Sequence, residues 1–174
     1  MKHCNPFLTI ATILLLSGIS HAGWFSNSPT EVVKGSTLNL NETTTIGQAF
    51  DGAFDSPAWQ DFTTDKGQAV VEFSGRISEA THQAAVKMLG EYYSAYDLYR
   101  FCMANGDYSD FKGDESDMGQ LITHFMNTQW WPVGAACTVQ FLMNVDGESF
   151  QVGAMESTAW RGIPETTILE IIYQ

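Results

Sequence analysis

The pattern from Cys137 to Met155 constrains the fold more than any other part of the sequence. Apolar residues occupy every second position from Cys137 to Val145, Asp146-Gly147 supplies a turn that can take a positive φ, and an extended segment returns from Ser149 to Met155. Such alternation is typical of a strand with one buried face and one exposed face. We therefore expect an antiparallel hairpin whose apolar face is covered by other elements.

A second hairpin is predicted upstream of the first. Ala58–Phe62 forms one arm, Thr64–Gly67 the turn and Ala69–Ile77 the other arm. Along the last of these segments Val71 and Phe73 point to one side, and polar residues alternate with them. Two such hairpins can join into one antiparallel sheet.

Helical patterns separate and flank these hairpins. A capping box at Thr45–Gln48 starts a short amphipathic helix, and apolar residues at helical spacing predict a long helix from Ser78 to about Ala104 and another over 117–129. We also expect an extended segment over 32–40 and a terminal helix over 164–173, whose β-branched residues leave a strand open. The predicted class is α+β: an antiparallel sheet of about four to five strands, helices packed on one face and a two-helix insertion at 78–131.

The first 22 residues have the pattern of a secretory signal peptide. Lys2 precedes an apolar run from Phe7 to Leu16, and Ser20-His21-Ala22 is a small-x-small cleavage site. We expect a signal peptide over 1–22, a tether over 23–30 and a single α+β domain over 31–174. The predicted location is periplasmic or secreted.

The charge balance argues against two classes of partner. The chain has 8 basic and 20 acidic residues, a formal net charge of −12 at pH 7. Such a charge repels phosphate backbones and anionic headgroups, so we expect no nucleic-acid partner. Beyond the leader no apolar run approaches the roughly 20 residues that a membrane helix needs, so we expect no membrane insertion.

Two cysteines, Cys102 and Cys137, lie beyond the predicted cleavage site. In an oxidising compartment an even pair indicates one disulfide, which is the prediction made here. Two separate buried thiols, each acting as a small apolar side chain, are the alternative.

Acidic residues cluster between Asp107 and Asp117. Clustered carboxylates suit calcium, so weak binding of Ca²⁺ in this loop is one prediction. The spacing differs from the EF-hand pattern, and Asp114 and Asp117 also suit the start of a helix, so a solvated loop is the alternative. We assign no metal ligands and expect no cofactor.

The sequence contains no recognisable catalytic constellation. His82 and His124 are the histidines beyond the leader, there is no H-E-x-x-H, and the G-x-S-x-G pattern fails because Gln151 follows Gly147–Phe150. We therefore assign no catalytic residue.

Aromatic residues are concentrated in the predicted insertion. Tyr92, Tyr93, Tyr96 and Tyr99 fall within about two helical turns, and they cannot all face one core. Interfaces favour tyrosine and tryptophan, although core packing also uses them. The predicted partner-binding residues are Tyr92, Tyr96, Trp130 and Trp131.

Several short segments resemble a known group of proteins. These segments are Thr45–Phe50, Trp59, Gly67, Val70–Phe73, Val139–Phe141 and the Asp146-Gly147 turn. Together they resemble a family of uncharacterised small Gram-negative secreted or periplasmic proteins and lipoproteins. The order of elements is also similar in architecture to β-lactamase-inhibitor-like envelope modules. The resemblance implies a compartment and a fold type and carries over no functional residue.

Two functions follow as hypotheses. The first is a secreted periplasmic binding module without catalysis that acts on another cell-envelope protein. The alternative is a small periplasmic hydrolase whose site is assembled from separated residues around His124.

Overall fold

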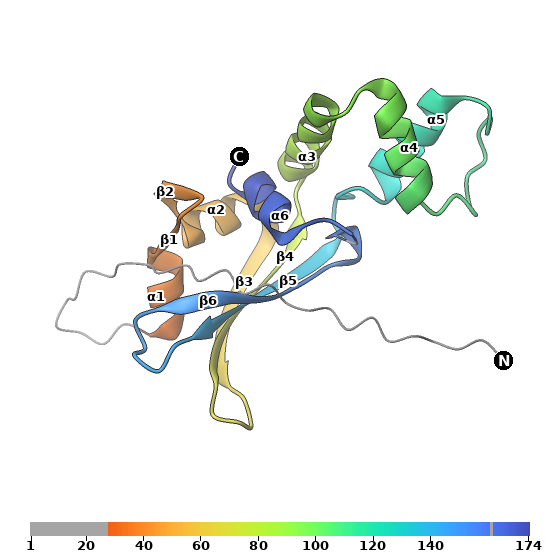
Figure 1. Cartoon of the computed structure of the whole chain (residues 1–174). Helices are drawn as coiled ribbons and strands as arrows, with labels where there is room; N and C mark the ends of the chain where they lie inside the picture. The colour runs from red at the N-terminus through yellow and green to blue at the C-terminus, as the bar shows by residue number, and fades with distance from the viewer. Residues whose placement is uncertain (1–27, 161) are drawn as a thin grey trace.

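The computed structural model describes residues 28–160 and 162–174. Over these residues the chain forms six α-helices, one two-stranded and one four-stranded antiparallel sheet, which confirms the α+β class (Figure 1). The predicted signal peptide and positions 23–27 of the predicted tether lie outside the described residues. No helix in the described part of the chain is long and apolar enough to cross a membrane.

The larger sheet joins both predicted hairpins. Its strands are β3 (Phe54–Thr63), β4 (Ala69–Ile77), β5 (Ala136–Met143) and β6 (Phe150–Glu156), in the order β3-β4-β5-β6. β4 and β5 pair antiparallel although 58 residues separate them in the chain, with Phe73 opposite Val139. Gly67 and Gly147 take positive φ in the two hairpin turns, as the turn sequences predict.

The core lies between this sheet and three helices. They are α1 (Pro29–Gly35), which contacts β3 and β4, α2 (Ile46–Ala53), which contacts β3, and α6 (Glu165–Ile172), which contacts α2. The ring of Phe50 lies edge-on to Phe73 with 4.9 Å between centroids and 5.8 Å from Phe141. The predicted capping box is confirmed, because Thr45 Oγ1 accepts from Gln48 N and Gln48 Oε1 accepts from Thr45 N.

The extended segment predicted over 32–40 is wrong for its first half. That half belongs to α1, and only the short strand β1 (Thr37–Leu38) follows, paired with β2 (Asn41–Thr45). The helix forms because Ser28 and Glu31 make a second capping box and Pro29 occupies the first helical position. Positions 28–30 are therefore part of the helix start rather than of a tether.

The long helix predicted from Ser78 is two helices. α3 (Glu79–Tyr92) ends before Ser94, and α4 (Ala95–Asn105) begins after it. Ser94 Oγ accepts from Asp97 N and donates to Asp97 Oδ2, so it caps a new helix. α4 packs against α5 (Met118–Thr128), and Figure 1 shows this pair standing away from the sheet.

Candidate functional site

A mainly apolar hollow of about 410 Å³ lies where α3, α4 and α6 meet. α3 contacts both α4 and α6, so the three helices form its walls. Its volume falls within the range of roughly 300–1,000 Å³ that is usual for ligand sites. The residues that matter for its chemistry are Leu89, Tyr92, Tyr93, Phe101, Trp130 and Glu170.

Stacked aromatic rings hold the floor of the hollow in place. Trp130 Nε1 donates to the carbonyl oxygen of Ala85 at 3.2 Å, which fixes the indole against α3. Phe101 meets Trp130 edge-on with 5.5 Å between centroids, and Tyr93 stacks on Phe101 at the same distance. These contacts form a continuous aromatic path from the protein surface to the floor, and such contacts favour a preformed site.

Three tyrosines stand exposed at the corner between α3 and α4. Tyr92 is 71 % exposed, Tyr96 is 63 % exposed and Tyr93 is 39 % exposed. Tyr92 and Tyr93 also line the hollow. The helix break at Ser94 creates this corner, and we call the three exposed tyrosines together with the hollow the tyrosine corner.

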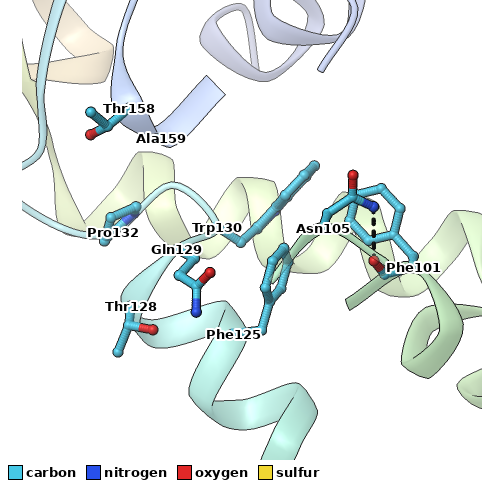
Figure 2. Close-up of a pocket in the computed structure, with 9 residues that line it drawn as sticks. All are labelled: Phe101, Asn105, Phe125, Thr128, Gln129, Trp130, Pro132, Thr158 and Ala159. Atoms are coloured by element: carbon cyan, nitrogen blue, oxygen red, sulfur yellow. Dashed lines mark hydrogen bonds between the residues drawn. The ribbon is translucent and has the colours of Figure 1, made fainter. Parts of the chain in front are cut away.

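A second, smaller hollow of about 200 Å³ is also lined by Phe101 and Trp130 (Figure 2). Its polar groups are already paired within the chain. Asn105 Nδ2 donates to Phe101 O at 2.8 Å, and the Gln129 side-chain amide bonds to both backbone groups of Asp107. These pairings stabilise the end of α4, and the second hollow therefore offers few free polar groups to a ligand.

Of the four predicted partner-binding residues, Trp131 is fully buried. Its side chain is 0 % exposed and packs 5.6 Å from the ring of Trp160. Its carbonyl oxygen lies 2.9 Å from His82 Nδ1. Trp131 is therefore a core residue, and its side chain cannot touch a partner of the folded protein. Trp130 is also buried but forms part of the floor, while Tyr92 and Tyr96 are accessible.

The disulfide predicted between Cys102 and Cys137 is absent, and both are free, buried thiols. Cys102 belongs to α4, whereas Cys137 lies on β5 and its Sγ contacts Gly75 O at 3.4 Å. Burial raises the pKa of Cys102 to about 11 and that of Cys137 to about 12. The alternative of two separate apolar-like thiols is the one that the structure adopts.

The calcium site predicted between Asp107 and Asp117 is not supported. Across 28–160 and 162–174, no group of three or more His, Cys, Asp or Glu side chains is placed to hold a metal ion. The carboxylates serve their own turns instead: Asp114 Oδ1 accepts from Ser116 N and Oγ, and Asp117 Oδ1 caps α5. The Ser116 hydroxyl in particular lowers the pKa of Asp114.

His124, the residue at the centre of the hydrolase hypothesis, has a carboxylate neighbour but no hydroxyl or thiol bonded to its ring among the described residues. Its Nε2 lies 3.3 Å from Asp110 Oδ1, and the ring packs between Tyr108 and Phe111. In the part of the chain that the structure describes, Nε2 has no hydrogen bond to a hydroxyl or a thiol. The nearby hydroxyl of Thr128 donates to the backbone carbonyl of His124 instead. A side-chain nucleophile activated by His124 would need such a hydrogen bond, and the described residues do not provide one.

Comparison with known proteins gives no relative: no family profile, no curated protein and no solved structure matches the chain.

Most of the residues that line the hollow were not predicted from the sequence. Leu89, Phe101 and Glu170 line it but were not predicted as site residues. The Ser94-x-x-Asp97 capping pattern could have located the helix break and hence the corner. Nothing in the local sequence places α6 beside α3, so Glu170 could not have been found without the fold.

Proposed function

We propose that this protein is a secreted periplasmic binding module without catalysis, which docks another cell-envelope protein at the tyrosine corner. The observation that carries the proposal is the exposure of Tyr92, Tyr93 and Tyr96 together beside a hollow with a fixed aromatic floor. Exposed tyrosines next to a preformed pocket are typical of the residues that dominate binding energy in protein interfaces.

Three adjacent tyrosines need an explanation beyond core packing. Isolated exposed apolar side chains are normal, whereas contiguous exposed apolar patches mark interaction surfaces. Tyr92 is the most exposed of the chain's described aromatic residues, yet the neighbouring Tyr93 stacks on Phe101 in the wall of the hollow. A partner that covers the corner therefore gains apolar contact without a large rearrangement of the floor.

The compartment in this proposal rests on the sequence. The leader at 1–22 and the resemblance of segments such as Thr45–Phe50 to Gram-negative secreted proteins support a periplasmic or secreted location. The hydrolase hypothesis is less well supported, because in the described part of the chain His124 Nε2 lies near the Asp110 carboxylate but has no hydrogen bond to a hydroxyl or a thiol.

Site-specific photo-crosslinking in the envelope of the source cell tests the proposal. A photoreactive phenylalanine analogue replaces Tyr92 or Tyr96, and Val145, which is fully exposed in the β5–β6 turn, serves as the matched control position. We expect one protein adduct of the same mass from positions 92 and 96 and none from position 145.

Binding of the identified partner then gives the second measurement. The double variant Tyr92→Ala/Tyr96→Ala should bind it at least about tenfold more weakly, as expected for two interface tyrosines. His124→Gln should bind it with unchanged affinity. Equal adducts from all three positions, or none from positions 92 and 96, would contradict the proposal.

A further inference from the structure

Glu170 brings a negative charge to the wall of an otherwise apolar hollow. It lies on α6 and lines the hollow together with Leu89, Phe101 and Trp130. No hydrogen bond or ion pair joins it to another residue in 28–160 and 162–174, so its carboxylate is available to a ligand. A carboxylate beside apolar walls interacts more strongly with an incoming cation than one in open water.

Acidic side chains lie on both sides of the tyrosine corner. Glu91 and Asp97 are exposed on either side of the helix break, Arg100 is exposed on α4, and no lysine or arginine is among the described residues that line the hollow. Lys87 is the basic group on α3, and it lies 3.8 Å from Glu91 as an exposed pair. With a net charge of −12 over the whole chain, the field favours a basic ligand.

Resting on the proposed function, we propose that the partner presents a basic peptide segment to this site. One large apolar side chain of the segment enters the hollow above Trp130, and an adjacent lysine or arginine pairs with Glu170. The tyrosines, of which Tyr96 lies outside the hollow, cover the rest of the segment.

The other occupants fit the charges less well. A second copy of this chain would bring two strongly acidic molecules together, which costs electrostatic energy. An anionic lipid headgroup meets the same repulsion. A small apolar molecule could fill the hollow but would leave Tyr96 uncovered and Glu170 unpaired.

Selection from a library of random displayed peptides tests the proposal without assuming a sequence. The library is panned on the full secreted chain and counter-selected on its Tyr92→Ala variant. The expected peptides contain a Trp, Phe or Leu residue next to Lys or Arg. The strongest peptide, labelled with a fluorophore, is then titrated with wild type, Glu170→Gln and Glu165→Gln.

The matched pair of α6 variants separates a local effect from a general loss of charge. Glu165 is on the same helix as Glu170 but does not line the hollow. Glu170→Gln should weaken binding by about threefold to tenfold, and Glu165→Gln should leave the affinity nearly unchanged. Binding should also weaken as salt is added.

The possible outcomes distinguish this inference from the proposed function. The basic-segment inference is overturned if the selected peptides require Tyr92 but lack basic residues, or if they bind Glu170→Gln as tightly as wild type. Either result would still support binding at the tyrosine corner. If no peptide depends on Tyr92, and the protein instead self-associates or retains only apolar small molecules, both proposals fail.

Discussion

His82 Nδ1 lies 2.9 Å from the carbonyl oxygen of Trp131, which joins the first turns of α3 to the segment that follows α5. A carbonyl oxygen can only accept, so the imidazole donates from Nδ1. Beside it, Ile77 N donates to Ala135 O at 3.0 Å and Gly134 N donates to Ile77 O at 2.8 Å. The two ends of the helical insertion are therefore fastened to each other at its base, from which α3 runs to the tyrosine corner.

Truncation to alanine should cost much more stability at Trp131 than at Tyr92. Trp131→Ala should lower the free energy of unfolding by about 3–5 kcal/mol, because it empties a fully buried site. Tyr92→Ala should change it by no more than about 0.5 kcal/mol. Urea denaturation measures both.

Trp131→Phe is the control for this pair. It keeps most of the packing and removes an indole N–H that has no acceptor among the described residues, so it should cost less than Trp131→Ala. A Tyr92→Ala variant that unfolds as readily as Trp131→Ala would show that the corner is structural.

Both thiols should be unreactive in the native protein. Burial raises the pKa of Cys102 to about 11 and that of Cys137 to about 12, so at about pH 8 very little thiolate is present. A colorimetric thiol reagent should react slowly with native protein and rapidly with two thiols in urea. Fewer than two reactive thiols in urea without reductant would contradict the free thiols and support a disulfide between Cys102 and Cys137.

The same thiols predict a loss of stability in alkali. In the folded state burial holds the pKa of each thiol above its ordinary value, so the folded protein keeps protons that the unfolded chain releases. This contribution is complete below about pH 9 and is lost as the pH rises towards 11 or 12. Urea midpoints should fall over that range, and Cys137→Ala should reduce the fall.

Two glycines should differ in the sign of their response to alanine. At Gly75 on β4, an added Cβ would lie 2.8 Å from the Phe73 ring and 2.9 Å from Phe54 Cβ. Gly75→Ala should therefore destabilise the protein by about 1–3 kcal/mol. Gly90 lies inside α3 with nothing within 4 Å of an added Cβ, so Gly90→Ala should stabilise it by about 0.5–1 kcal/mol. Thermal unfolding of both variants measures the signs, and equal shifts would contradict the packing at Gly75.

Calcium should have no effect on stability. The carboxylates of Asp114 and Asp117 already accept hydrogen bonds within their own turns, and a ligand that binds only the folded state would raise its Tm. The Tm in millimolar calcium should equal the Tm in chelator. If calcium raises the Tm and Asp114→Asn abolishes this rise, the loop binds calcium as the sequence predicts.

Elements whose signals are local can be predicted from the sequence alone. The turns at Gly67 and Gly147 and the capping box at Thr45 depend on residues within a few positions of each other, and the structure confirms them. The helix break at Ser94 was equally local, but the apolar periodicity of 78–104 outweighed its capping pattern in the prediction.

Which aromatic residues form the site depends on the packing of distant segments. Trp130 and Trp131 are identical residues next to each other in the chain. Trp131 takes a positive φ of 49° and packs against Trp160. Trp130 donates a hydrogen bond to the carbonyl oxygen of Ala85 and forms the floor of the hollow. Sequence spacing cannot separate two adjacent tryptophans, because their burial depends on segments distant in the chain. Glu170 reaches the hollow for the same reason: α6 packs against α3, and that contact is encoded by the whole core.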